Sequence, residues 1–225
     1  MKKASIEKRR FILSLWFPAF FILVIWLIKI SEMVLDISLA NYGILPGSWS
    51  GLKGILTSPL IHSDFQHLIA NTGPLFVLSV GLFYFYNKIA YRVYFLIYFI
   101  TGIWVWFGAR EAYHIGASGI VYGLAAFIGV SGIIRKNIQL TAISLLVVFL
   151  YGGMVWGVLP IDPRISWEGH LSGMTAGIVL AFYFRNYGPP PDYHQWQDDD
   201  DDDDDENAYW KVTDFSDSDN TFKYK

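Results

Sequence analysis

Residues 116–134 read GASGIVYGLAAFIGVSGII, an apolar stretch without a charged side chain that carries a serine near its start. At a rise of ~1.5 Å per residue, a helix over Ser118–Ile134 nearly crosses a hydrocarbon layer of ~30 Å. Similar stretches fill much of the chain, whose 225 residues are 53% hydrophobic and 18% aromatic. We therefore predict an all-α, polytopic membrane protein rather than a soluble domain.

Six apolar segments are long enough to be predicted as membrane spans. Their approximate bounds are Phe11–Ile28, Leu68–Tyr86, Ile89–Gly108, Ser118–Ile134, Ile138–Leu159 and Leu171–Phe184. The basic segment Met1–Arg10 before the first span also fits a signal peptide, but no small-residue cleavage site follows, which favours an uncleaved span. Lys29–Gln66 is too polar to cross and too apolar for a free loop, so it is predicted to be a partly membrane-embedded first loop.

The distribution of charge divides the chain into two predicted domains. Residues 1–187 form the six-span membrane domain and carry a net charge of +7, whereas residues 188–225 carry −10. Ten of the 14 basic residues of the membrane domain lie on one side if the N-terminus is cytoplasmic. The positive-inside rule therefore predicts that both termini face the cytoplasm.

The predicted tail has the composition of a disordered polymer. Asp198–Asp205 is an unbroken run of aspartates, in which repulsion between like charges opposes folding. The run could also bind divalent cations weakly or attract basic partners. Because aromatic residues flank it, a docking motif is a further alternative.

Polar residues distant in sequence meet at one membrane depth in this topology. The second span enters from outside near His67 and Asn71, the fourth at Ser118 and the sixth at His170. Polar groups at membrane depth are costly and are usually retained for a function. We therefore expect one shared site near the outer surface.

Ser118 and His170 could form a nucleophile and base. A serine hydroxyl needs a base in contact, and the free N–H groups at the start of a helix favour developing negative charge. Taken alone, Ser118 also fits a packing residue or helix cap, and His170 fits a structural hydrogen-bonding histidine. No acid follows His170 in its span, so a dyad is favoured over a triad.

The flanking residues permit close approach of the two helices. Gly169, Gly173 and Gly177 recur at every fourth position, and Gly119 and Gly123 offer a matching surface on the fourth span.

His67 and Asn71 share one helix face at i, i+4 spacing and could donate to an oxyanion, although polar bonding between helices would explain either of them alone. His62 is off the spacing of helical zinc ligands, so neither a metal nor a cofactor is expected, and the absence of cysteine excludes thiolate catalysis.

The ordered set of motifs resembles the rhomboid family of intramembrane serine proteases. The matching pattern begins with His62-x4-His67-x3-Asn71 and continues with Gly116-Ala117-Ser118-Gly119 and Tyr122, then with Gly169-His170-x2-Gly173-x3-Gly177. The resemblance implies a bacterial-type six-span core with Ser118 as nucleophile and His170 as base. It also implies an oxyanion hole formed by the Ser118 backbone N–H and the His67 and Asn71 side chains, and a Tyr122 ring stacked on His170. Many members carry a Trp-Arg pair in the first loop, where this chain reads Leu52-Lys53-Gly54 with Trp49 nearby.

The expected function is an intramembrane endopeptidase that cuts transmembrane segments of other membrane proteins near their outer ends. Its partners would be those substrates and the lipid bilayer, with no nucleic acid, and its location would be a bacterial inner membrane. A non-catalytic adaptor of the same fold is the alternative. A small-molecule transporter is a third possibility, although the sequence lacks evident inverted repeats.

Overall fold

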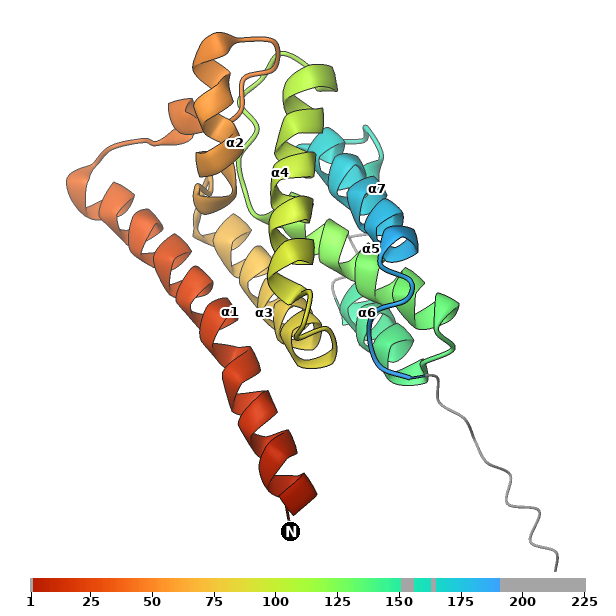
Figure 1. Ribbon diagram of the computed structural model, residues 1–225. Coiled ribbons are helices and arrows are strands. Elements are labelled where there is room, and N and C mark those ends of the chain that lie inside the picture. Colours follow the sequence, from red (N-terminus) through yellow and green to blue (C-terminus); the bar gives the residue numbers. More distant parts are fainter. Residues whose placement is uncertain (1, 151–155, 163–164, 191–225) are drawn as a thin grey trace, which may run out of the picture. The chain divides into compact units, whose positions relative to one another are not determined.

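The computed structural model describes residues 2–150, 156–162 and 165–190, and within them it contains helices and no strands. The long helices are α1 (Lys2–Leu35), α3 (Phe65–Phe85), α4 (Ala90–Gly108), α5 (Ser118–Ile134), α6 (Ile138–Leu150) and α7 (Trp167–Tyr183) (Figure 1). The predicted all-α membrane bundle is confirmed. Most of the predicted tail, 191–225, lies outside the described residues.

The predicted spans differ from the helices mainly at their ends. α5 coincides with its predicted span, and α3 begins three residues early because Asp64 caps it by accepting the His67 N–H at 2.7 Å. α1 is longer than predicted, at 34 residues. Of the span predicted over Ile138–Leu159, α6 covers Ile138–Leu150, and residues 151–155 lie outside the described residues.

Three of the described helices, α1, α3 and α4, are long and apolar enough to cross a membrane. α5 and α6 are also apolar, but α5 contains 17 residues and the described part of α6 contains 13. α7 also has 17 residues and begins at Trp167, so His170 lies inside the first turn rather than before the helix.

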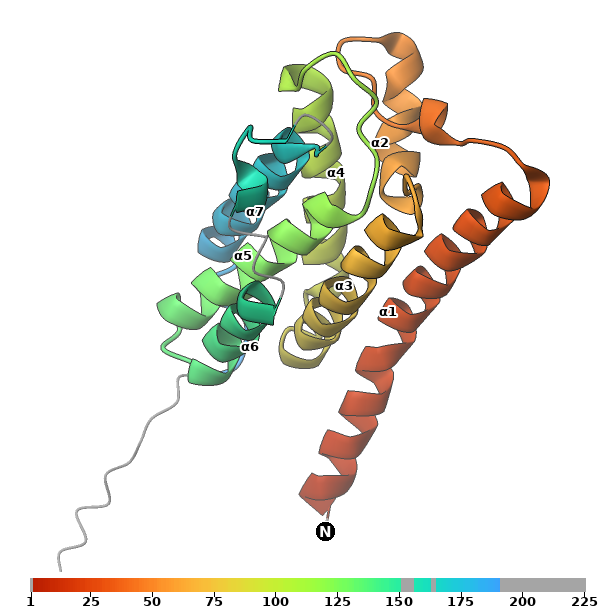
Figure 2. The same ribbon diagram turned by 180° about the vertical axis from the view of Figure 1, so that it is seen from behind.

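The core lies where α3, α4, α5 and α7 pack together. Leu75, Leu78 and Leu82 occur at helical spacing on α3 and are at most 1% exposed, like Leu124 and Phe127 on α5. α5 and α7 form the most extensive helix pair. α1 packs mainly on α3 at the edge of the bundle (Figures 1 and 2).

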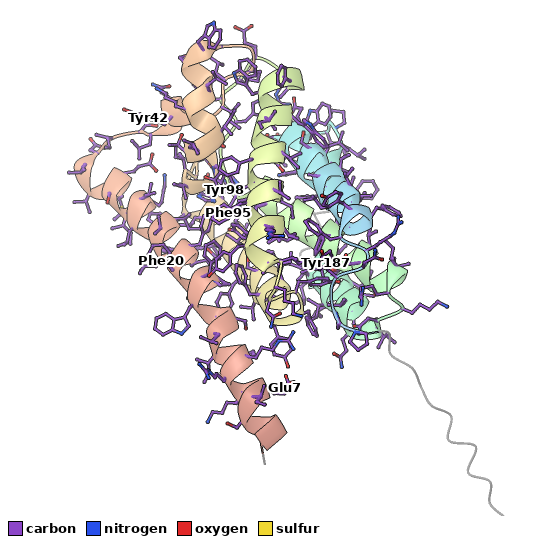
Figure 3. All side chains as sticks on the ribbon, viewed as in Figure 1. Glu7, Phe20, Tyr42, Phe95, Tyr98 and Tyr187 are labelled. Carbon is purple, nitrogen blue, oxygen red and sulfur yellow. The ribbon has the colours of Figure 1, made fainter. Side chains whose placement is uncertain are left out.

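The first loop folds into four short helices, η1 (Ala40–Tyr42), η2 (Trp49–Lys53), α2 (Gly54–Thr57) and η3 (Ser58–Leu60). It is fastened to α4: the hydroxyl of Tyr98, labelled in Figure 3, donates to the Leu56 carbonyl, and Trp106 Nε1 donates to the Ser48 carbonyl at 2.9 Å. Lys53, near the place of the family's Trp-Arg pair, lies over the Tyr42 ring. The loop is therefore held against the middle and the C-terminal end of α4, and its embedding in lipid remains a prediction.

Candidate active site

Ser118 is the first residue of α5 and lies directly after a tight backbone turn. Gly116 has φ +107°, and a Cβ there would lie 2.7 Å from the His67 ring, so only glycine fits. The Gly116 N–H donates to the Ser58 carbonyl at 2.8 Å, which ties the turn to the first loop. This turn places the Ser118 hydroxyl at the N-terminus of α5, where backbone N–H groups have no partner within the helix.

His170 contacts this hydroxyl. Its Nε2 lies 2.8 Å from Ser118 Oγ, and its Nδ1 lies 2.7 Å from the Gly157 carbonyl oxygen. A carbonyl oxygen can only accept, so Nδ1 carries the proton and Nε2 of the neutral ring has a free lone pair. The arrangement therefore leaves Nε2 able to accept the Ser118 proton.

Two further contacts fix the plane of the imidazole. The Tyr122 ring stacks on His170, with centroids 4.2 Å apart and an angle of 10° between the planes. Gly157, in the short helix η5 (Trp156–Val158), passes so close that a Cβ would lie 2.1 Å from the Tyr122 hydroxyl oxygen. The ring is thus held from one face by Tyr122 and from its edge by Gly157.

Glycines bring α5 and α7 close enough for the contact between Ser118 and His170. A Cβ on Gly173 would lie 1.9 Å from the Gly119 carbonyl oxygen, and one on Gly177 would lie 2.1 Å from that of Gly123. The glycine positions found in the sequence are therefore where the two backbones meet.

His67 and Asn71 lie one turn apart on α3, and His67 faces the turn before Ser118. The edge of the His67 ring that carries Nε2 faces the Gly116 α-carbon, and its Nδ1 lies 3.2 Å from Ser63 Oγ. Asn71 is buried, and its amide donates to the His67 carbonyl at 2.9 Å rather than to Ser118. The structure therefore puts the His67 ring beside the turn and Asn71 one helical turn further along α3, and their role toward an oxyanion stays a prediction.

His62 lies behind this pair. It is 1% exposed, its ring is 5.1 Å from that of His67, and the Ala117 N–H points toward its Nε2 at 3.4 Å. Burial, assisted by the charges of His67 and Lys29, lowers the pKa of His62 from 6.5 to about 3. His62 is therefore neutral and supports the backbone just before Ser118.

A small cavity of about 30 Å³ lies against Ser118. Its lining includes Thr101, His114 and Ser166 together with apolar side chains of the first loop and α4. Polar space of this size holds about one water molecule. Water therefore has room next to the hydroxyl.

The start of α7 is braced by residues that the sequence did not single out. Ser166 Oγ lies 2.7 Å from His114 Nδ1, and Glu168 pairs with Arg110 at 3.4 Å. Burial is the main cause that lowers the pKa of His114, which favours its neutral form. The loop before Ser118 is thereby joined to the first turn of α7, which contains His170.

The helical bundle and the contact between Ser118 and His170 define a membrane protein with the geometry of a serine hydrolase dyad. A profile described as the Rhomboid domain matches residues 47–187, and the chain belongs to the rhomboid family.

Similar proteins include "Uncharacterized protein Rv1337" of Mycobacterium tuberculosis (strain ATCC 25618 / H37Rv), which is 34% identical over 72% of this chain and 71% of its own length. "Putative rhomboid protein L523" of Acanthamoeba polyphaga mimivirus is 30% identical over 60% of this chain and 77% of its own length. "Putative rhomboid protease YdcA" of Bacillus subtilis (strain 168) is 27% identical over 63% of this chain and 70% of its own length.

Proposed function

We propose that the protein is an intramembrane serine endopeptidase that cleaves transmembrane segments of other proteins near their outer ends. The observation that carries the proposal is the 2.8 Å contact between Ser118 Oγ and His170 Nε2, with Nδ1 protonated toward the Gly157 carbonyl. Membership of the rhomboid family and the name of the Bacillus subtilis relative, a putative protease, support it.

Acylation begins with transfer of the Ser118 proton to His170 Nε2. Oγ then bonds to the carbonyl carbon of the scissile peptide, whose oxygen becomes negative. The Ser118 backbone N–H, the Asn71 amide and His67 Nε2, when that nitrogen carries a proton, are the donors proposed for this oxyanion. Collapse breaks the C–N bond, and His170 returns its proton to the departing amine.

Deacylation repeats these steps with water. His170 Nε2 takes a proton from a water molecule as the water oxygen attacks the acyl carbon. The bond between that carbon and Ser118 Oγ then breaks, and His170 returns the proton to Oγ. The cavity beside Ser118 supports water access. The scissile segment must unwind, because a helix occupies its carbonyls with hydrogen bonds, so segments with helix-breaking residues near the cut are the proposed substrates. The resemblance to the rhomboid family further implies a small residue just before the cut.

The proposed location is a bacterial inner membrane with both termini in the cytoplasm, and residues 1–187 form the proposed catalytic domain. Reconstitution of purified protein with a membrane-anchored reporter tests the activity. Cleavage by the wild type that is lost in Ser118→Ala, and retained in Ser5→Ala as a control at an exposed serine, supports the proposal. Equal cleavage by Ser118→Ala contradicts it, and binding of an intact reporter by the wild type identifies an adaptor instead.

A further inference from the structure

An ion pair lies at the outer end of α1, before the matched family domain begins at residue 47. Lys29 Nζ is 3.2 Å from Glu32 Oε2, and the two side chains are only 14% and 6% exposed. Buried charges are costly, and an exposed surface pair would contribute little to stability. The stability of α1 alone therefore does not explain why a charged pair is buried at this position.

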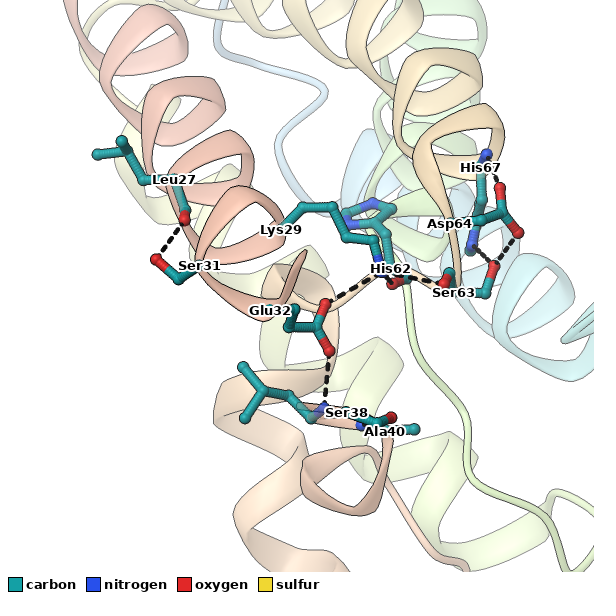
Figure 4. Close-up of polar contacts among 11 residues, drawn as sticks. Leu27, Lys29, Ser31, Glu32, Ser38, Ala40, His62, Ser63, Asp64 and His67 are labelled. Atoms are coloured by element: carbon teal, nitrogen blue, oxygen red, sulfur yellow. Dashed lines mark hydrogen bonds and ion pairs between the residues drawn. The ribbon is translucent and has the colours of Figure 1, made fainter. Parts of the chain in front are cut away.

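Lys29 reaches out of its helix to the segment that leads into α3. Besides Glu32, its ammonium donates to the His62 carbonyl and the Ser63 carbonyl, both at 3.0 Å (Figure 4). An ammonium has three N–H donors, and these three acceptors use all of them. Because His62 and Ser63 belong to neither helix nor strand, their carbonyls need partners from elsewhere in the molecule.

Glu32 completes the connection on the other side. Its Oε1 accepts the Leu39 backbone N–H at 2.7 Å while Oε2 holds Lys29. The pair thus joins α1 both to the start of the first loop and to its end (Figure 4).

The carbonyls held by Lys29 are next to the groups that set the His67 ring. Ser63 Oγ donates to Asp64 Oδ2 at 2.8 Å and lies 3.2 Å from His67 Nδ1, and Asp64 Oδ1 accepts the His67 N–H. A shift of the backbone at Ser63 therefore moves the ring edge that faces the turn before Ser118.

We propose that Lys29 is a positioning residue for this site: by holding the carbonyls of residues 62 and 63 it fixes His67 beside Ser118. The proposal rests on the proposed function for its kinetic consequence. It makes α1, outside the matched domain, a functional part of the enzyme. Lys29 does not touch the reacting atoms and acts only through this segment.

Three variants separate the contacts of Lys29 from the cost of an unpaired charge. Lys29→Met removes the positive charge and the N–H donors but keeps an unbranched side chain. Lys29→Arg keeps the charge and the donors. Lys29→Met/Glu32→Gln also removes the Glu32 charge, so that no unpaired carboxylate is left. The His62 and Ser63 carbonyls lose their donor in both variants that carry the Met substitution, whichever side chain stands at position 32. Ser31→Ala is the control, because exposed Ser31 bonds only to the Leu27 carbonyl of its own helix (Figure 4).

Reporter cleavage and amide hydrogen exchange are measured together for each variant. We expect kcat to fall about tenfold or more in Lys29→Met and in the double variant, with KM within about twofold, since small misplacements are costly to catalysis. Lys29→Arg recovers most of the rate and Ser31→Ala resembles the wild type. Amides of residues 61–68 exchange faster in both Met variants.

Several results would overturn the proposal. These are unchanged exchange over 61–68, a kcat near the wild-type value in the double variant, or a loss confined to KM. Exchange needs no turnover, so a wild type that fails to cleave any reporter refutes the proposed protease while exchange still decides whether Lys29 orders the segment.

Discussion

At the scale of single residues, Gly157 does for His170 what the aspartate of a Ser-His-Asp triad does: it holds one ring nitrogen so that the other faces Ser118, the proposed nucleophile. Its carbonyl oxygen lies 2.7 Å from Nδ1. A carbonyl can orient the ring but carries no full charge to stabilise an imidazolium. The contact between His170 and Ser118 therefore depends on the position of the Gly157 backbone.

Replacement of Gly157 by alanine tests this dependence. A Cβ there would lie 2.1 Å from the Tyr122 hydroxyl oxygen and 3.0 Å from His170 Nδ1, so the carbonyl or the rings must move. We expect kcat for reporter cleavage to fall by about 10²-fold, the loss typical of a misplacement near 1 Å. Gly108→Ala, where a Cβ meets nothing within 4 Å, serves as control, and equal rates in both variants would refute the orienting role.

His62 makes the stability of the fold depend on pH. Its pKa is about 3 in the folded protein, mainly because of burial, against 6.5 when solvated. Between these values the unfolded chain binds a proton that the folded chain does not, so stability is full above pH 6.5 and falls as the pH drops toward 3, by at most about 1.4 kcal/mol per pH unit.

Thermal unfolding in detergent should therefore show a midpoint that falls from pH 7 to pH 4, with a shallower fall in His62→Gln. The lowered pKa of His114 contributes in the same direction and persists in the variant. Parallel pH profiles for the two proteins would show that His62 is not held neutral by the fold.

The sequence allowed Ser118 and His170 to be predicted because each lies among glycines at a helix end. Gly157 and Lys29 could not be found in the same way. One acts through a backbone carbonyl 13 residues from His170, and the other through carbonyls more than 30 residues away. Such contacts leave no pattern of side chains in the sequence.

At the scale of elements, the pairing of α5 with α7 decides whether the dyad exists. Gly173 lies one turn after His170, and a Cβ there would come within 1.9 Å of the Gly119 carbonyl oxygen. The backbones have no room for even one methyl group at this point.

We therefore expect Gly173→Ala to push the helices apart and to lower both thermal stability and cleavage, the latter by about 10²-fold. Gly81→Ala on α3 is the matched control, because its Cβ would meet the nearest atom at an ordinary 3.7 Å and would favour the helix. Full activity in Gly173→Ala would mean that the close approach is not needed.

Helix positions were more predictable than helix ends. Apolar length located each long helix, but the helix ends follow polar contacts that hydropathy does not register. Asp64 caps α3 by accepting the His67 N–H, and α1 continues past Lys29 and Glu32, whose charges pair with each other. A hydropathy pattern does not report such pairing.

At the scale of the whole molecule, the distribution of charge predicts orientation. The chain has no cysteine, so single cysteines can report the side of the membrane without background. We expect a cysteine at exposed Glu111 to react with an impermeant thiol reagent from outside intact cells, and one at exposed Lys88 to react only after lysis. The reverse pattern would put the dyad at the cytoplasmic surface and contradict cleavage near the outer end of a substrate.

The most direct test of the central claim is the labelling of the purified protein by a fluorophosphonate, with the modified peptide identified by mass spectrometry. A hydroxyl activated by His170 displaces the leaving group and keeps one phosphonyl group. We expect one adduct, on Ser118, absent from Ser118→Ala and formed far more slowly in His170→Ala. An unmodified wild type, or an adduct that forms equally fast without His170, would contradict a catalytic dyad in this protein.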